Sequence, residues 1–148
     1  MMGTFTKSFG AAGGYIGGST ALINHLRQFS HGTTYASTIS PPVAAQALTA
    51  LKTIGYTQTG KDRINQLAKN TRVMRRALKE AGFLIFGCDE SPVIPVIICE
   101  FCKMEEFQKM CAKYGLAVVV VSFPATPLSE SRARLCLSGK LNVKEFLV

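Results

Sequence analysis

The sequence predicts an α/β protein, and two patterns support this class. Apolar residues recur at helical spacing through much of the first 82 residues, and short β-branched or aromatic runs follow, interrupted by one more helical segment. Hydrophobic residues make up 47% of the 148 residues and charged residues 18%, a composition that excludes a disordered chain. Because this charged fraction is lower than that of an average soluble domain, the sequence also indicates a buried interface.

The first part of the chain predicts two helices and a short strand. Residues 19–28 have apolar positions on one helical face, and Ser19 is suited to cap the N-terminus. A second helix is expected to begin at Pro41 and to end near Gly55, because proline is tolerated in a first helical turn. Between them, residues 33–36 are β-branched and aromatic, which predicts a strand.

A third helix is predicted up to Gly82, a good C-terminal cap, and it carries most of the net charge. Residues 61–80 contain seven basic side chains against two acidic ones, so +5 of the net charge of +8 lies there. The basic residues are Lys61, Arg63, Lys69, Arg72, Arg75, Arg76 and Lys79. The apolar face is predicted from Ile64, Leu67, Ala68, Thr71, Leu78 and Ala81. We interpret this segment as a packed helix with a solvated basic face. A nucleic-acid site is not expected, because no aromatic residues lie among the charges.

After Gly82 the pattern changes to strands. Strands are predicted at residues 83–86, 93–99, 116–121 and 132–138, and a helix at residues 104–114. The run of four valines that ends at Val121 is typical of a strand covered on both faces.

The five cysteines predict reduced thiols rather than disulfides. Their number is odd, and the chain starts without the apolar segment of a secretory signal. Cys99 and Cys102 form one Cys-x-x-Cys pair, but a structural zinc site needs two more ligands at similar spacing. We therefore expect buried structural thiols and no metal site. No apolar stretch reaches the length of a membrane-spanning helix.

Lys7 lies between hydroxyl residues, just ahead of a glycine-rich turn. A Walker phosphate loop requires glycine directly before the lysine, where this chain has Thr6. The amine could instead condense with a carbonyl cofactor whose phosphate is held by nearby hydroxyl and N–H groups. A surface lysine beside a glycine turn has the same spacing, so the residues alone leave both interpretations open.

The segment Thr-Phe-Thr-Lys-Ser-Phe-Gly-Ala-Ala-Gly-Gly-Tyr at residues 4–15 resembles the pyridoxal-phosphate lysine segment of the α-oxoamine synthases. These are fold-type-I enzymes that join an amino acid to an acyl-CoA with loss of CO₂. Three more stretches, at residues 35–42, 115–127 and 130–138, follow in the family's order. Among them, Phe-Pro-Ala-Thr-Pro and Arg-x-Arg are most similar to the branch that condenses L-serine with palmitoyl-CoA to 3-ketodihydrosphingosine in sphingolipid synthesis.

The resemblance implies a role for individual residues. Lys7 matches the lysine that binds pyridoxal phosphate covalently, and Thr4 matches a hydroxyl that binds the cofactor phosphate. Ser37, with Thr38 as the alternative, matches a hydroxyl that reaches the phosphate of the partner subunit's cofactor. Arg134 matches the arginine that clamps the amino acid's carboxylate, a task suited to a bidentate guanidinium.

The strand that contains Arg134 and the loop before it each allow two interpretations. Strand alternation places Arg132, Arg134 and Cys136 on one face and Ala133 and Leu135 on the other. A polar face toward a cleft is consistent with this pattern, and so is a surface ion pair. Residues 124–127 resemble a mobile loop that closes on substrate, although a rigid surface turn fits the same residues.

The resemblance also implies the domain organisation. Residues 1–55 would form the C-terminal part of the cofactor-binding large domain and add strands to its mostly parallel sheet. Residues 56–148 would form a small C-terminal α+β domain that ends within a helix beginning near Asn142. The family's pyridine-binding aspartate and ring-stacking histidine lie upstream of the lysine. This chain has no counterpart of either, so we expect a fragment that is inactive alone.

The expected partners are L-serine, a long-chain acyl-CoA and a related subunit without the lysine. The expected location is the cytosolic side of the endoplasmic reticulum membrane. One alternative is a sister activity: glycine C-acetyltransferase, 5-aminolevulinate synthase or 8-amino-7-oxononanoate synthase. Another is a truncated, non-catalytic piece that pairs with a subunit. The family's usual ending after the last strand is broken here by Ser138-Gly139-Lys140.

Overall fold

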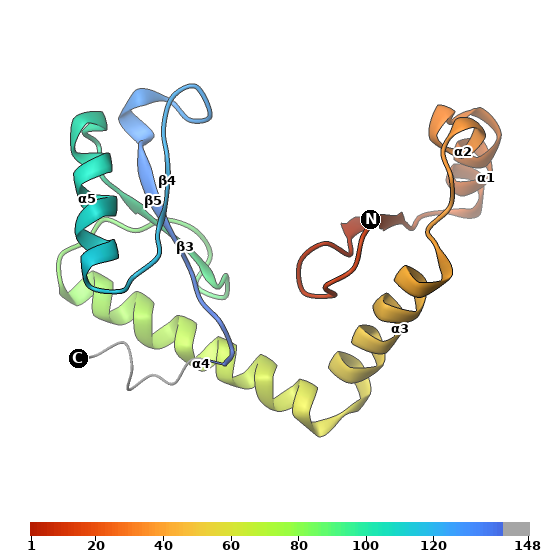
Figure 1. Cartoon of the computed structure of the whole chain (residues 1–148), viewed down its shortest axis with the longest axis horizontal. Helices are drawn as coiled ribbons and strands as arrows, with labels where there is room; N and C mark the ends of the chain where they lie inside the picture. The colour runs from red at the N-terminus through yellow and green to blue at the C-terminus, as the bar shows by residue number, and fades with distance from the viewer. Residues whose placement is uncertain (141–148) are drawn as a thin grey trace. The chain divides into compact units, whose positions relative to one another are not determined.

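The computed structural model describes residues 1–140, which divide between Lys61 and Asp62 into two compact units. The first unit contains an N-terminal hairpin and three helices. The second contains most of a long helix, a three-stranded sheet and a helix packed on that sheet (Figure 1). The helix expected near Asn142 lies outside the described residues. The domain boundary expected after residue 55 derives from the family resemblance and stays a prediction.

The first unit begins with an antiparallel hairpin. Strand β1 (Met2–Thr4) pairs with β2 (Gly14–Ile16), so that Thr4 lies opposite Gly14. Helix α1 (Thr20–Phe29) follows, and the Ser19 hydroxyl accepts a hydrogen bond from the backbone N–H of Leu22 at 3.4 Å. The predicted helix and its cap are therefore confirmed.

Residues 33–36 do not form the predicted strand. They belong mostly to a short helix, α2 (His31–Tyr35), which follows α1 after one residue. The hydroxyl of Thr33 donates to the carbonyl of Leu26 at 3.3 Å, and that of Thr34 donates to the carbonyl of Ser30 at 3.2 Å. Threonine hydroxyls thus bond to the preceding helical turns, and this local bonding overrides the β propensity of the residues.

Helix α3 (Pro41–Tyr56) begins with two prolines in its first turn, as predicted. Helix α4 (Gln58–Glu80) follows after Thr57. Gly82, two residues beyond its last residue, caps it as expected: Gly82 has φ +82°, and the N–H of Phe83 donates to the carbonyl of Leu78 at 2.9 Å. A left-handed residue at this position closes a helix with little cost only when it lacks a Cβ.

The buried side of α4 is more polar than the sequence predicted. Asn70, Thr71 and Arg75 are almost fully buried, whereas Ile64, expected on the apolar face, is 51% exposed. The amide of Asn70 donates to the carbonyl of Ser138 at 3.0 Å, just beyond the last strand. Burial of a polar side chain costs little free energy when its hydrogen bonds are formed.

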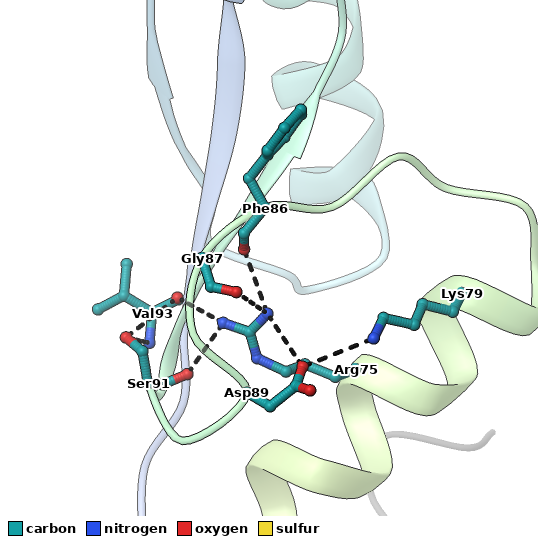
Figure 2. Close-up of polar contacts among 7 residues, drawn as sticks. All are labelled: Arg75, Lys79, Phe86, Gly87, Asp89, Ser91 and Val93. Carbon is teal, nitrogen blue, oxygen red and sulfur yellow. Dashed lines mark hydrogen bonds and ion pairs between the residues drawn. The ribbon is translucent and has the colours of Figure 1, made fainter.

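Arg75 corrects the expectation of a fully solvated basic face. Its side chain turns into the loop at residues 86–93, as Figure 2 shows. Nη1 donates to the carbonyls of Phe86 at 3.2 Å and Gly87 at 3.5 Å. Nη2 donates to those of Ser91 at 3.3 Å and Val93 at 3.4 Å. One guanidinium therefore fastens α4 to the loop that leads into the sheet.

The sheet of the second unit has β5 at its centre. Strand β5 (Arg132–Cys136) pairs antiparallel with β3 (Val93–Ile97) on one side and with β4 (Val119–Val121) on the other. Helix α5 (Phe101–Lys113) lies beside these strands, and a 3₁₀ turn, Leu128–Glu130, precedes β5 (Figure 1). The buried apolar side chains of this unit are Ile94, Val96, Met104, Val118 and Ala133.

Two strand predictions need correction. Residues 83–86 contribute only one bridge, from Ile85 to Val96, instead of a strand. Strand β4 is not covered on both faces, since Val119 is 49% exposed. All strand pairs within residues 1–140 are antiparallel, and the contribution of the first unit's strands to a mostly parallel sheet stays a prediction. Pairing depends on distant segments, which local composition does not specify.

The cysteines are free, as predicted, but they are not buried. Four of them are exposed, and only Cys111 on α5 is partly covered. Composition cannot distinguish a buried cysteine from an exposed one, because a strand or helix exposes one face and buries the other.

Cys111 is expected to react with a thiol-specific alkylating reagent more slowly than the other four cysteines. Burial raises the pKa of its thiol, and the thiolate is the nucleophile, so less of the reactive form is present near neutral pH. Timed alkylation followed by peptide mapping would measure the five rates. The deficit should shrink as the pH rises past the ordinary thiol pKa. Equal rates for Cys111 and Cys136 at neutral pH would contradict the expectation.

Candidate active site

Lys7 lies in the loop between β1 and β2, the red hairpin in Figure 1. The loop is closed by hydrogen bonds from the N–H of Phe5 to the carbonyl of Gly13 and from the N–H of Ala11 to the carbonyl of Phe5, both 2.9 Å. Within it, the N–H of Gly10 donates to the carbonyl of Lys7 at 3.1 Å. The turn leaves the Lys7 side chain exposed. The loop thus presents an amine on a short, closed backbone turn.

Glycines make this turn possible, as the sequence predicted. Gly10 has φ +58° and Gly13 has φ +84°, both in the region that favours glycine. A Cβ on Gly14 would lie 2.5 Å from the carbonyl oxygen of Gly3 on the facing strand. No side chain fits between these two backbones.

The hydroxyls expected beside the lysine are present in the same loop. The hydroxyl of Thr6 donates to that of Thr4 at 3.3 Å. Among residues 1–140, Lys7 forms no ion pair, so its amine is not held by a carboxylate of this part of the chain. The loop therefore combines an available amine with hydroxyl groups, the donor set that a phosphorylated carbonyl compound needs.

Thr4 also lines a shallow hollow of about 550 Å³ between the hairpin and α1. Arg27, in the last turn of α1, and Thr33 of α2 line the same hollow. A guanidinium beside hydroxyl groups is suited to an anion. Sequence reasoning missed Arg27, because only the packing of α1 beside the hairpin brings it near Thr4.

Ser37 and Thr38 lie in the exposed segment between α2 and α3. The following residue, Ile39, is close to the lysine loop, since a Cβ on Gly13 would lie 2.8 Å from its Cγ2. The fold therefore brings this hydroxyl segment to the base of the loop within the first unit. The role of Ser37 or Thr38 in binding a partner subunit's cofactor stays a prediction.

Arg134 lies on β5, opposite Pro95 of β3 and Val119 of β4. Its side chain is exposed, as is that of Cys136, while Ala133 before it is fully buried and Leu135 after it is half-buried. The predicted alternation of the strand is confirmed. Arg132 is half-buried, and the substrate-binding role of Arg134 stays a prediction.

Residues 122–127 form a turn in which the N–H groups of Ala125 and Thr126 donate to the carbonyl of Ser122, at 2.9 and 3.2 Å. Thr126 is 5% exposed, and its hydroxyl has no hydrogen-bond partner among the described residues. A buried hydroxyl without a partner is unusual. Closure of this segment on a substrate stays a prediction.

Comparison with known proteins identifies the class of protein. Residues 1–147 match the family Aminotransferase class I and II, and the chain belongs to this family. It is 51% identical over 141 residues to serine palmitoyltransferase 3 of Mus musculus, a match that covers 93% of this chain and 25% of that protein. The chain thus spans about a quarter of the length of this curated relative.

Solved structures share the fold. The serine palmitoyltransferase of Sphingomonas wittichii superposes with a TM-score of 0.86 at 25% sequence identity, covering 99% of this chain and 37% of that one. A second serine palmitoyltransferase structure, described as carrying a PLP internal aldimine, has a TM-score of 0.86 at 22% identity, covers the same shares and shows the fold alone. The α/β, fold-type-I class predicted from the sequence is confirmed.

Residues 1–140 show neither a metal cluster nor a membrane-spanning helix. No group of three or more histidine, cysteine or acidic side chains is arranged to hold a metal ion there. No helix in that range is both long enough and apolar enough to cross a membrane.

Proposed function

We propose that this chain is the lysine-bearing part of a longer, pyridoxal-phosphate-dependent serine palmitoyltransferase subunit. The longer enzyme condenses L-serine with palmitoyl-CoA, releases CoA and CO₂, and forms 3-ketodihydrosphingosine. The observation that carries the proposal is the lysine loop, with its free amine and adjacent hydroxyls. The similarity of nearly the whole chain to serine palmitoyltransferases supports this activity over the sister α-oxoamine synthases.

The residues present fit pyridoxal phosphate. Gly14 lets the two strands approach closely, and the hairpin offers the Lys7 amine and the Thr4 hydroxyl. Lys7 would hold the cofactor covalently, and Thr4 would donate to its phosphate. Arg27, which lines the same hollow as Thr4, supplies positive charge near that group.

In the proposed reaction, Lys7 would move a proton and Arg134 would hold the substrate. Lys7, released by the incoming amino group of serine, would accept the proton from the serine α-carbon. Arg134 would hold the serine carboxylate through two parallel hydrogen bonds. When bound, pyridoxal phosphate supplies an electron sink for the carbanion that this proton transfer leaves.

The proposal includes a partner and a location. The partner is a related subunit without the lysine, and Ser37 or Thr38 would contact the cofactor that the neighbouring subunit binds. The location is the cytosolic side of the endoplasmic reticulum membrane. Both rest on the resemblance to the eukaryotic enzymes.

A second candidate is a non-catalytic piece that pairs with a subunit. Ala47 is the only buried apolar residue within residues 1–61, while Phe29, Tyr35 and Tyr56 are each at least 68% exposed. So small a core leaves apolar surface for other protein to cover. This candidate predicts subunit association without cofactor binding.

Pyridoxal phosphate followed by borohydride is expected to label Lys7 selectively. The closed turn holds this amine beside hydroxyls that can bind the phosphate, whereas Lys52 on α3 provides a matched exposed lysine. We expect Lys7 to be labelled about tenfold more than Lys52, as a modest binding free energy of about 1.4 kcal/mol would produce. Peptide mapping of the wild-type chain and of Lys7→Ala and Lys52→Ala variants would measure this.

The two candidates give different results. Label concentrated on Lys7, and lost in Lys7→Ala but not in Lys52→Ala, supports the cofactor-binding role. Label spread evenly over the exposed lysines rejects it and leaves the association role. Activity with serine and palmitoyl-CoA would be assayed in the longer subunit with its partner, with glycine and short acyl-CoAs as the competing substrates.

A further inference from the structure

The exposed side of α4 carries a stripe of positive charge. Lys69, Arg72, Arg76 and Lys79 follow one another at intervals of three or four residues, which places them along one side of the helix. All four side chains are exposed. Within residues 1–140, neither Arg72 nor Arg76 forms an ion pair, so their charges are available to a ligand.

The C-terminal half of this stripe borders a hollow of about 420 Å³. Arg72, Arg75, Arg76 and Lys79 line it, together with the acidic residues Glu80 and Asp89. Arg75 differs from the others because it is only 3% exposed, and its Nε has no hydrogen-bond partner among the described residues. The hollow therefore contains a buried, incompletely bonded cation as well as surface cations.

The charge in this hollow is incompletely balanced. The four carbonyls around Arg75 supply dipoles but no net negative charge. Two carboxylates, Glu80 and Asp89, line the hollow beside four cations. Asp89 pairs with two of these cations, with its Oδ1 4.0 Å from Nη1 of Arg75 and 3.5 Å from Nζ of Lys79 (Figure 2). Its side chain is 75% exposed, so this contact is made at the surface and is easily replaced.

We propose that this hollow is an anion site for a phosphate-bearing ligand, which binds Arg72, Arg76 and Lys79 and displaces Asp89. Phosphate fits this donor set because guanidinium groups bind its oxygens through paired hydrogen bonds, and its charge exceeds that of one carboxylate. A nucleic acid is less suited, because no aromatic side chain lines the hollow to stack on bases. The phosphate could belong to a soluble compound or to a lipid headgroup.

Titration calorimetry of the 148-residue chain with inorganic pyrophosphate tests the site. The Arg72→Gln/Arg76→Gln variant is expected to bind about tenfold more weakly, since charge-assisted hydrogen bonds are lost. Lys61→Gln/Arg63→Gln removes the same charge from exposed positions near the start of the same helix and should bind like the wild type. Asp89→Asn should bind several-fold more tightly, because the competing carboxylate is gone.

These variants distinguish a site from a general charge effect. Equal weakening by both double variants, or no saturable binding by the wild type, would overturn the proposal. An unchanged or weaker affinity of Asp89→Asn would overturn the displacement of Asp89. Tighter binding by that variant cannot arise from a damaged fold, so the test does not depend on loss of function alone.

Vesicle sedimentation separates the two sources of phosphate. Vesicles of phosphatidylcholine with phosphatidic acid would bind the wild-type chain, and pyrophosphate would release it, if the ligand is a lipid headgroup. Pyrophosphate binding without vesicle binding would assign the site to a soluble phosphate compound. Vesicle binding that the Arg72→Gln/Arg76→Gln variant retains in full would contradict a role for this hollow.

Discussion

Replacing Arg75 by alanine is expected to lower the free energy of unfolding of the chain by about 3 kcal/mol. The guanidinium donates to four carbonyls of the loop at residues 86–93, and alanine removes all four hydrogen bonds of a side chain that is only 3% exposed. The loop leads directly into β3, which contributes Ile94 and Val96 to the core. Urea denaturation followed by far-ultraviolet circular dichroism would measure the change.

Two further variants test the cause of this loss. Arg76→Ala removes the same side chain from the next position on α4, where it is exposed and makes no ion pair within residues 1–140, and we expect a change below about 0.5 kcal/mol. Arg75→Lys should fall between wild type and alanine, because one ammonium cannot span four carbonyls on both sides of a loop. Similar destabilisation by Arg75→Ala and Arg76→Ala would show that helix packing, not the loop contacts, matters at this position.

Replacing Gly14 by alanine is expected to abolish most of the selective labelling of Lys7. The new Cβ would lie 2.5 Å from the carbonyl oxygen of Gly3, a backbone atom that cannot move without separating β1 from β2. Such overpacking typically costs about 1–3 kcal/mol, which corresponds to a loss of about 5- to 150-fold in the population of the closed loop. Borohydride labelling and peptide mapping would report this loss at Lys7.

Gly17→Ala is the matched control for this variant. A Cβ on Gly17 has nothing within 4 Å, and its φ lies outside the region reserved for glycine. The same methyl group added three residues away should leave the labelling of Lys7 unchanged. Undiminished labelling in Gly14→Ala would mean that the amine does not depend on the closed hairpin for its reactivity.

Local chemistry predicted the helices and the turns of this protein well. Ser19 caps α1, Pro41 and Pro42 open α3, and Gly82 closes α4, because each residue acts through its own backbone or its nearest neighbours. The lysine loop belongs to the same group, since its glycines specify a tight turn from within the segment. The alternation of β5 follows from strand geometry alone.

Longer-range features were predicted less well. The threonines of α2 favour a strand by composition. In the folded chain their hydroxyls instead donate to carbonyls of the preceding helical turns. The prediction of buried cysteines was wrong for four of the five, because composition carries no information about which face of an element meets the core. The place of Arg27 beside the hairpin could not be predicted, since nothing in the sequence links α1 to the hairpin.

The sequence by itself determined the family, the lysine loop and the positions of most helices, because motif residues and local hydrogen bonding are contiguous in the chain. Only the tertiary structure decided that Arg75 is buried while Arg72, Arg76 and Lys79 remain exposed, although all four belong to one basic helix. The reason is physical. A guanidinium can be buried only where carbonyls from another segment converge on it, and the loop at residues 86–93 provides them.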